Sequence, residues 1–499
     1  MLVNDSKQTA QNQTAQNQTA QNQSAQNQSA QNQSASASNA SAANSSSHTA
    51  AKAAPQATKP RIGGGPLNVL LIGGGGREHA LAIAMKRSPR LNTLHITHPE
   101  NPGLAAMGIA VNVPVNIREI YRLQRYIEKH AINLVVIGPE EPLAQGFADK
   151  LASESTLVFG PVAEAARLEA DKSYAKQVMR AASIPTAEAR TFTDVESANA
   201  YIETRIDPPV VKASGLAKGK GVIVASTQDE AKDAIRRIMI NKEFGDAGNS
   251  VLIEERMHGR EASVLAIVDG KSILVLPVCQ DHKRVGDNDT GPNTGGMGAY
   301  CPSDALSLAD MQRVEREVLV PIVDTMRRDG IEFRGVLYAG LMLTHGGPKV
   351  LEFNCRFGDP ECQALVSRLT SDILELFVAT CTSKLDEIDV TWDPRPSCCI
   401  VLASEGYPDK PKFGVEIQGV ERAAAQPDVR VDHAGTKLVA GKLVTAGGRV
   451  LNVTALGSSL ADAAKKAYAA AGMITFPGMV MRTDIGHVLA VAHSPRVRF

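Results

Sequence analysis

Short apolar runs alternate with amphipathic stretches at the start of the folded sequence. The apolar runs are NVLLI (68–72), TLHIT (93–97), NLVVI (133–137) and LVFGP (157–161). Between the second and third runs, residues 117–130 repeat their apolar positions at the helical period. Strands that alternate with helices predict a parallel sheet, whose ligands bind beyond the carboxyl ends of the strands. The candidate binding loops are therefore 73–79, 98–103 and 138–141.

A glycine-rich turn, GGGGREHAL at 73–81, joins the first predicted strand to a helix. Backbone N–H groups at such a turn can bind a phosphate. The turn does not match the G-x-G-x-x-G/A fingerprint of dinucleotide sites, because the third G/A position falls on Glu78 or His79. A nicotinamide-dependent oxidoreductase is therefore disfavoured. Two interpretations stay open: a loop that contacts a phosphate or polar metabolite, and a tight turn without a ligand.

A second unit begins with a helix predicted over 171–185, with Asp171 as its N-cap. The stretch 208–226 predicts a strand, a glycine loop and a second strand, with Lys212 and Lys220 on either side of the loop. The loop is not a Walker A motif, because no GK[ST] opens a helix. Its N–H groups and ammonium groups could close over a triphosphate; a solvated basic hairpin is the alternative.

The stretch 250–277 predicts a strand at Val251–Glu255 and then a hairpin with its turn at Asp269-Gly270, and a second late hairpin is predicted from 336–343 and 349–361. In the last strand Glu352 and Asn354 are two residues apart, so their oxygens project from one face. A carboxylate and an amide oxygen aimed together suit Mg²⁺, although many such pairs only face solvent. The polar, glycine-rich segment QDHKRVGDNDTGPNTGGMGAY (280–300) offers little to a core.

The composition of the chain disfavours several classes of function. A chain of 499 residues predicts about three domains. Lys+Arg and Asp+Glu are both 53, so there is no global basic field for nucleic acid or an anionic membrane, and no apolar run has the length of a membrane span. The seven cysteines form no CxxC pair, which favours a reducing cytoplasm and buried thiols.

Residues 1–66 are of low complexity, with QNQTA and QNQSA repeats followed by Ser, Ala and Asn. Such a segment has too little apolar side chain to offset the entropy of ordering, so we predict a disordered tail. A transit peptide is disfavoured, because Arg is absent before position 61. A scaffold acting through this tail would leave the charged, glycine-rich segments without a purpose.

Taken together, the motifs resemble the ATP-grasp superfamily of carboxylate–amine ligases and, within it, the phosphoribosylamine–glycine ligase family. The resemblance covers about residues 67–490 and rests on GGGGREHAL (73–81), GPEEPL (138–143), VKASGLAKGKGV (211–222), the segment 280–300 and RFGDPECQ (356–363). It implies a multidomain α/β and α+β fold. The implied domains are a parallel-sheet α/β domain (67–166), an ATP-grasp domain (167–390, with a lid at about 185–257) and a small α+β domain that closes the cleft (391–499).

The resemblance also implies the reaction, an ATP-dependent ligation of glycine to 5-phosphoribosylamine. The products are glycinamide ribonucleotide, ADP and phosphate, and the intermediate is glycyl phosphate. The implied cofactors are ATP and Mg²⁺ or Mn²⁺, and the expected enzyme is a cytoplasmic monomer or weak homodimer of purine biosynthesis. The alternative is another ATP-grasp carboxylate–amine ligase, such as a carboxylase subunit.

Residue roles follow from the same resemblance. Glu352 and Asn354 are the expected metal ligands. Arg356, Asp359, Asp281 and Lys283 are the expected catalytic residues. Expected at the nucleotide are Lys172, Lys212, Gly219, Lys220, Gly221, Glu254, Glu255, Met257 and Glu261. Expected at the substrates are Gly75, Arg77, Glu78, Pro139, Glu140, His282, Arg284, Gly295, Gly296 and Met297.

Overall fold

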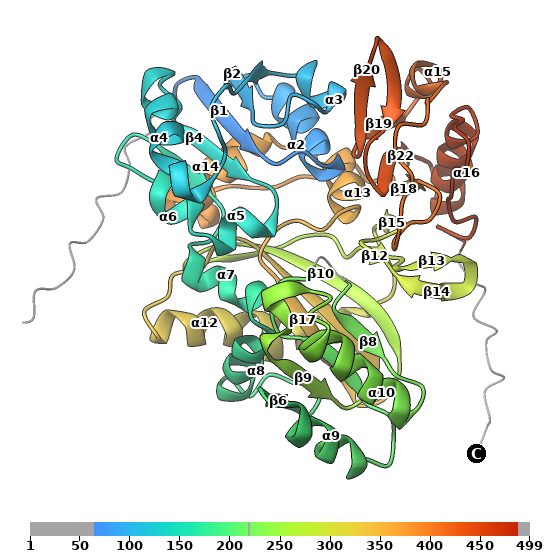
Figure 1. Cartoon of the computed structure of the whole chain (residues 1–499). Helices are drawn as coiled ribbons and strands as arrows, with labels where there is room; N and C mark the ends of the chain where they lie inside the picture. The colour runs from blue at the N-terminus through green and yellow to red at the C-terminus, as the bar shows by residue number, and fades with distance from the viewer. Residues whose placement is uncertain (1–63, 218–219, 488–499) are drawn as a thin grey trace, which may run out of the picture. The chain divides into compact units, whose positions relative to one another are not determined.

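The computed structural model describes residues 64–217 and 220–487 (Figure 1). The segment predicted to be a disordered tail therefore lies outside the described residues, except for positions 64–66. Gly219 of the glycine loop lies outside them as well. Among the described helices, none combines the length and apolar character needed to cross a membrane.

The predicted parallel sheet is confirmed. Its five strands run in the order β3-β2-β1-β4-β5, and every neighbouring pair is parallel. The chain crosses from one side of β1 to the other, so β1 and β4 are neighbours at the point where the strand order reverses. The strands are β1 (Leu67–Ile72), β2 (Leu91–Ile96), β3 (Ile109–Ala110), β4 (Leu134–Ile137) and β5 (Leu157–Phe159).

Helices flank this sheet and begin directly after its central strands. The helix predicted at 117–130 forms as a short helical turn followed by α4 (Ile120–Lys129), which buries Leu123, Tyr126 and Ile127. The other helices of this region are α2 (Gly76–Lys86), α3 (Pro102–Ala105), α5 (Glu140–Ala144), α6 (Phe147–Leu151) and α7 (Ala163–Ala170). Because α2 and α5 start where β1 and β4 end, their first residues meet at the carboxyl edge of the sheet.

The central part contains two four-stranded antiparallel sheets (Figure 1). One has the order β6-β9-β7-β8, with β6 (Ala189–Phe192), β7 (Val210–Ala213), β8 (Val222–Val224) and β9 (Val251–Glu254). The other has the order β11-β10-β16-β17, with β10 (Arg260–Asp269), β11 (Ile273–Val275), β16 (Arg334–Thr344) and β17 (Gly347–Asn354). The predicted strand–loop–strand and the two predicted late hairpins are therefore confirmed.

One helix of the central part begins at the predicted cap. Helix α8 (Lys172–Ala181) begins after Asp171, whose carboxylate accepts the backbone N–H groups of Ser173 and Tyr174. The remaining helices here are α9 (Val195–Glu203), α10 (Gln228–Ile235), α11 (Leu308–Val314) and α12 (Val320–Arg328).

The C-terminal sheet takes in two strands from the central sequence. Its order is β12-β15-β18-β22-β19, so β12 (Gln280–Asp281) and β15 (Gly298–Cys301) join β18 (Ser397–Ala403), β22 (Arg449–Leu456) and β19 (Val429–His433). The Ala-rich helix α16 (Leu460–Ala471) packs its alanines into the core of this sheet. The polar segment 280–300 is therefore held at both of its ends by this sheet.

Helix α13 (Glu361–Arg368) begins within the RFGDPECQ motif and packs against helix α2 and the C-terminal sheet, and the next helix, α14 (Ile373–Thr382), packs against β5 of the parallel sheet. Residues such as Leu365 and Phe377 share one buried cluster with Leu71 and Phe159. The motif thus lies between the parallel sheet and the central sheets.

Candidate active site

A cleft of about 1270 Å³ lies where these parts meet. All three candidate binding loops line it, through residues Gly73 to Gly75, His98, Glu100 and Pro139 to Glu141. Both central sheets and Arg449 of the C-terminal sheet complete the walls. The carboxyl edge of the parallel sheet therefore faces the same space as the predicted metal strand.

The glycine turn folds around the side chain of Glu78. Its carboxylate accepts the Gly75 N–H at 2.7 Å and lies 2.6 Å from the Arg77 guanidinium. A Cβ at Gly138 would collide with this carboxylate, so glycine is required there for the close approach. Arg77 in turn donates to the Phe357 carbonyl at 2.9 Å. The turn is thus tied to the RFGDPECQ motif.

Strand β17 presents Glu352 and Asn354 to the cleft, as their spacing predicted. Phe353 between them is buried in the core of the adjacent sheet. The pairing with β16 shifts by one residue at a bulge at Leu351. The bulge changes which side chains of β17 share a face just before this pair. Burial would raise the pKa of Glu352, but Lys283 and Lys212 outweigh it and lower that pKa. Glu352 is therefore an ionised carboxylate.

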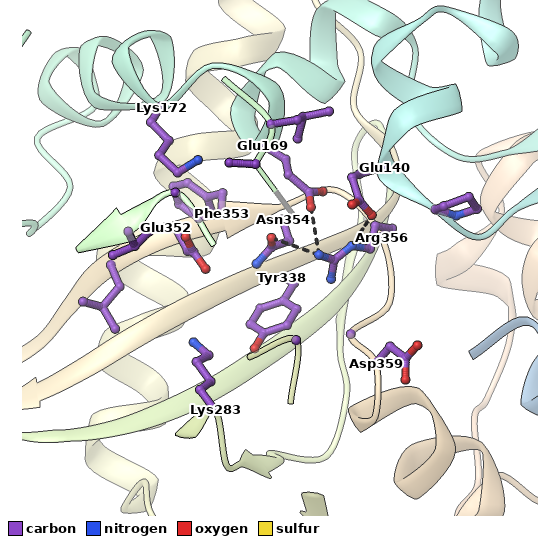
Figure 2. Close-up of a pocket in the computed structure, with 18 of the residues that line it drawn as sticks. Glu140, Glu169, Lys172, Lys283, Tyr338, Glu352, Phe353, Asn354, Arg356 and Asp359 are labelled. Atoms are coloured by element: carbon purple, nitrogen blue, oxygen red, sulfur yellow. Dashed lines mark hydrogen bonds and ion pairs between the residues drawn. The ribbon is translucent and has the colours of Figure 1, made fainter. Parts of the chain in front are cut away.

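Three lysines and one buried glutamate form a wall of the cleft close to Glu352. Lys212 lies 2.7 Å and Lys176 3.2 Å from the Glu254 carboxylate, and Lys212 also donates to the bulge carbonyl of Leu351 at 3.3 Å. Lys172 points toward strand β17 (Figure 2), and burial lowers its pKa. Three cations against one carboxylate leave net positive charge on this wall, which suits a polyanion.

An apolar slot lies beside the lysines. Its lining includes Val210 and Leu252 of one central sheet and Met342 and Leu351 of the other. The chain from Glu255 to His258 also lines the cleft. Within the described residues, the backbone groups of Arg256 and Met257 form no hydrogen bond with another backbone group. A flat aromatic ring could fill the slot and pair with this free edge.

Arg356 is held by carboxylates from two other segments (Figure 2). Its guanidinium lies 2.9 Å from Glu169 and 3.4 Å from Glu140, and it donates to Asn354 Oδ1 at 3.3 Å. Burial would lower the pKa of Arg356, but Glu169 and Glu140 raise it. In the same way Arg356 and Arg77 overcome burial and lower the pKa of Glu140. Arg356 is thus a fixed positive charge beside the predicted metal ligands on β17.

The segment 280–300 brings a further cation, Lys283, to the cleft. Lys283 lies 3.2 Å from Glu261 and 3.9 Å from Asp281. Burial would lower the pKa of Lys283, but these two carboxylates raise it well above its ordinary value. The tip of the segment is held from the C-terminal region, where buried Arg482 pairs with Asp289 at 2.7 Å.

Arg449 of strand β22 links the motif to that segment. Its guanidinium lies 3.2 Å from the Asp359 carboxylate and donates to the Gly295 carbonyl at 2.8 Å, and it also donates to the Asp359 carbonyl. Burial would raise the pKa of Asp359, but Arg449 and Arg77 lower it. Asp359 therefore lies at the contact between two parts of the chain, with its charge already paired.

The structure brings most of the expected site residues into one cleft. The lining includes Glu352, Asn354, Arg356, Asp359, Asp281, Lys283, Lys172, Lys212, Gly221, Glu254, Glu255, Met257, Glu261, Gly75, Arg77, Glu78, Pro139, Glu140, Arg284 and Gly295. Among the expected residues that the structure describes, four are not part of the lining: Lys220, His282, Gly296 and Met297.

These four have other contacts. Lys220 donates to the Pro408 carbonyl at 2.6 Å, so its ammonium group points to the C-terminal region. Met297 is fully buried and its N–H donates to the His282 carbonyl. Gly296 has a positive φ of 118° and packs against Pro360. They support the walls of the cleft.

Sequence reasoning did not single out five cleft residues. Glu169, Tyr338 and Arg449 carry no local signal, because their partners are far away in the sequence. Glu361 lies inside the RFGDPECQ motif, and Lys176 is four residues from Lys172 on one helix. Helical spacing could have identified Lys176 as a second lysine on the same face.

Cys355 lies next to Arg356 but points away from the cleft. It is buried, its Sγ is 3.7 Å from the Ala165 carbonyl, and burial raises its pKa well above the ordinary value. A thiol in this state is a poor nucleophile. We expect Cys355→Ala to keep turnover within about threefold of the native enzyme, since only a small side chain is lost. A steady-state assay checks this, and complete loss of activity in a folded variant would contradict it.

The chain matches the three family models of phosphoribosylglycinamide synthetase. The N domain matches residues 67–169, the ATP-grasp (A) domain residues 170–362 and the C domain residues 397–488. A phosphoribosylamine–glycine ligase of Rhodopirellula baltica is 48% identical over 426 residues, which are 84% of this chain and 97% of that protein.

Solved structures show the same similarity. The crystal structure of phosphoribosylamine–glycine ligase from Thermotoga maritima has a TM-score of 0.72 and 32% identity, covering 84% of this chain and 100% of that one. A biotin carboxylase domain of the Hydrogenobacter thermophilus 2-oxoglutarate carboxylase has a TM-score of 0.65 at 15% identity, covering 83% of this chain and 91% of that one. The second similarity concerns the fold alone.

Proposed function

The chain belongs to the phosphoribosylamine–glycine ligase family, and from this premise we propose that its cleft joins glycine to 5-phosphoribosylamine through a glycyl phosphate intermediate. The enzyme is a carbon–nitrogen ligase of purine biosynthesis. It converts ATP, glycine and 5-phosphoribosylamine to ADP, phosphate and glycinamide ribonucleotide. In the proposed first step the glycine carboxylate attacks the γ-phosphoryl group, and in the second the sugar amine displaces phosphate from the acyl carbon.

The nucleotide is assigned to the space between the two central sheets. Adenine fits the apolar slot, where the backbone of Arg256 and Met257 can pair with its edge and Glu261 lies within the same wall for the ribose. Lys172 and Lys212 would contact phosphate oxygens. The net positive wall formed by Lys172, Lys176, Lys212 and Glu254 supports this placement.

A divalent cation is assigned to Glu352 and Asn354. Their chemistry fits Mg²⁺ or Mn²⁺, because Glu352 is ionised and Asn354 presents an amide oxygen on the same face of β17. The hydrogen bond of 3.3 Å from Arg356 to that oxygen is long, so the oxygen keeps capacity for another partner. When bound, such an ion neutralises phosphate charge in the transition state.

The remaining charged groups are assigned to the substrates. Arg356, fixed by Glu140 and Glu169, would stabilise charge on the transferring phosphoryl group or the carboxylate. Gly75, Arg77 and Glu78 after the first strand of the N-terminal sheet, together with Asp359 and Arg284, would meet the sugar phosphate and amino acid. These residues align three reactants and exclude water from the acyl phosphate; no covalent enzyme intermediate is needed.

One observation carries the proposal: Glu352, Asn354 and the lysine wall line one cleft that also reaches the edge of the parallel sheet. Phosphate release by the purified enzyme tests it, with 5-phosphoribosylamine generated in place. We expect full release with all three reactants and only background release when any one is left out. Release that does not depend on glycine would contradict the proposal.

A further inference from the structure

A chain of four polar side chains crosses the floor of the cleft between Glu361 and Asp281. Tyr338 Oη lies 2.7 Å from Glu361 Oε1 and 2.7 Å from Ser263 Oγ. Ser263 Oγ lies 3.1 Å from Asp281 Oδ1. All four residues are buried, yet Glu361, Tyr338 and Asp281 line the cleft. Two carboxyl groups are thus connected through two hydroxyls.

The number of hydrogens in this chain depends on its protonation state. Three oxygen–oxygen contacts need three hydrogens, but the hydroxyls of Tyr338 and Ser263 supply only two. When both carboxyls are ionised, one contact has no hydrogen and two oxygens face each other at hydrogen-bond distance. One additional proton on Glu361 or Asp281 completes the chain. The four hydrogen-bonded side chains can therefore take up one additional proton.

We propose that Glu361 is the general base of the ligation step, and that Tyr338, Ser263 and Asp281 position and take up the proton it receives. This inference rests on the proposed function. The amine lone pair attacks the carbonyl carbon of glycyl phosphate, the C–N bond forms, and the C–O bond to phosphate breaks with its electron pair leaving on phosphate. The nitrogen loses one proton to a Glu361 oxygen. Proton transfers from Glu361 to Tyr338 Oη, from Tyr338 to Ser263 Oγ and from Ser263 to Asp281 can then leave the proton on Asp281, with both hydroxyls restored.

The surroundings of Glu361 suit this role near neutral pH. Burial, with the Asp281 charge added, raises the pKa of Glu361 to about 7. A base with a pKa near the working pH is the most effective. The titratable and charged groups that act on Glu361 from the packed elements are Asp281, Tyr338, Lys283, Arg356, Arg449 and Cys279.

Substitution of Glu361 by glutamine tests the general base without breaking the hydrogen bonds around it. The amide N–H can donate to Tyr338 at every pH, so Glu361→Gln keeps the hydrogen-bonded chain and removes only the proton acceptor. We expect turnover at pH 8 to fall about 10²-fold, in line with the loss of a general base. We also expect the decline of native turnover below pH 7 to be absent in this variant. Turnover between pH 6 and pH 9 is the measurement.

A second variant, Tyr338→Phe, keeps the ring and removes the hydroxyl. The hydrogen bond from Tyr338 lowers the pKa of Glu361 against the effect of burial. Without this hydrogen bond the pKa of Glu361 rises, so turnover should begin to decline at a higher pH than in the native enzyme. Glu375→Gln is the matched control, because Glu375 is also a first-turn glutamate of a helix but is half exposed.

The outcomes are distinct. A native rate in Glu361→Gln, with an unchanged decline of turnover at acid pH, would overturn the inference. The inference would also be wrong if turnover of Tyr338→Phe declined at the same pH as in the native enzyme or at a lower pH. If Glu361→Gln does not fold, Tyr338→Phe decides alone. Native enzyme that releases no phosphate with all three reactants present would instead overturn the proposed function.

Discussion

Replacing Glu352 by glutamine should lower turnover by about 10³-fold, because the ionised ligand of the proposed divalent cation is lost while the shape of the side chain is kept. Lys283, Lys212 and Lys172 all act on Glu352, so its negative charge also balances the lysine wall. Without that charge the cation is repelled by neighbouring lysines. We expect the variant to need a higher Mg²⁺ concentration for its remaining activity.

The fold should tolerate this change. Glu352 is only partly buried and glutamine fits the same position on β17. Turnover measured across a range of Mg²⁺ concentrations, together with a thermal unfolding curve, tests the expectation. Glu387→Gln, an exposed glutamate paired with Lys384, is the control and should keep native turnover. Native turnover of Glu352→Gln at the same Mg²⁺ concentration would contradict the assignment of β17.

The sequence was informative about β17 because the two-residue period of a strand decides which side chains share a face. This period alone places Glu352 and Asn354 on the same face of the strand. The bulge at Leu351 was not predictable in this way, since it depends on the pairing with Gly340 and Leu341 of β16. Four of the five strands of the parallel sheet were predictable for a similar reason, because each is a short apolar run with its own local signal. Strand β3 was not predicted, since its two residues are exposed and form no such run.

Charged partners from distant segments were not predictable. Arg356 is paired with Glu169 and Glu140, and Asp359 with Arg449, and only the folded chain brings these residues together. Lys220 is a residue that the local sequence did single out, but whose contact differs from the one expected. Its place beside a glycine loop predicted a phosphate contact, but in the structure it bonds to the Pro408 carbonyl. Local sequence identifies a side chain that can bind an anion, while its direction depends on the tertiary contacts of the loop.

The strands β12 and β15 show the same limit at the level of topology. The segment 280–300 has few apolar residues, and its ends pair with a sheet whose other strands begin about a hundred residues later. Gly298 fits there because β15 lies directly against β18, where a Cβ would meet the Cys399 carbonyl and Ile485. Such pairing follows from long-range contacts that no local pattern records.

The largest combined effect on stability and activity is expected for Arg356→Ala. The change leaves Glu169, which is buried and accepts the Cys355 N–H at 2.7 Å, without its cation. Removing one partner of a buried ion pair typically costs about 3–5 kcal/mol of folding free energy. We also expect turnover to fall by about 10³-fold, because a fixed positive charge at the proposed phosphoryl site is lost.

The loss of stability should depend on pH. Burial already raises the pKa of Glu169 with Arg356 present, and removal of the cation raises it further. A carboxyl whose pKa is higher in the folded than in the unfolded state destabilises the fold as it ionises, so the cost grows as the pH rises. Urea midpoints of Arg356→Ala should therefore lie closer to those of the native enzyme at pH 5 than at pH 8.

A second substitution separates the structural effect from the catalytic one. Glu169→Gln removes the unpaired charge, so Arg356→Ala with Glu169→Gln should regain much of the lost stability while turnover stays low, because the guanidinium is still absent. Arg327→Ala, at an exposed pair with Asp324, is the control and should change the midpoint little. A double variant that recovered turnover together with stability would show that Arg356 acts only by neutralising Glu169, and the proposed role at the transferring phosphoryl group would then be wrong.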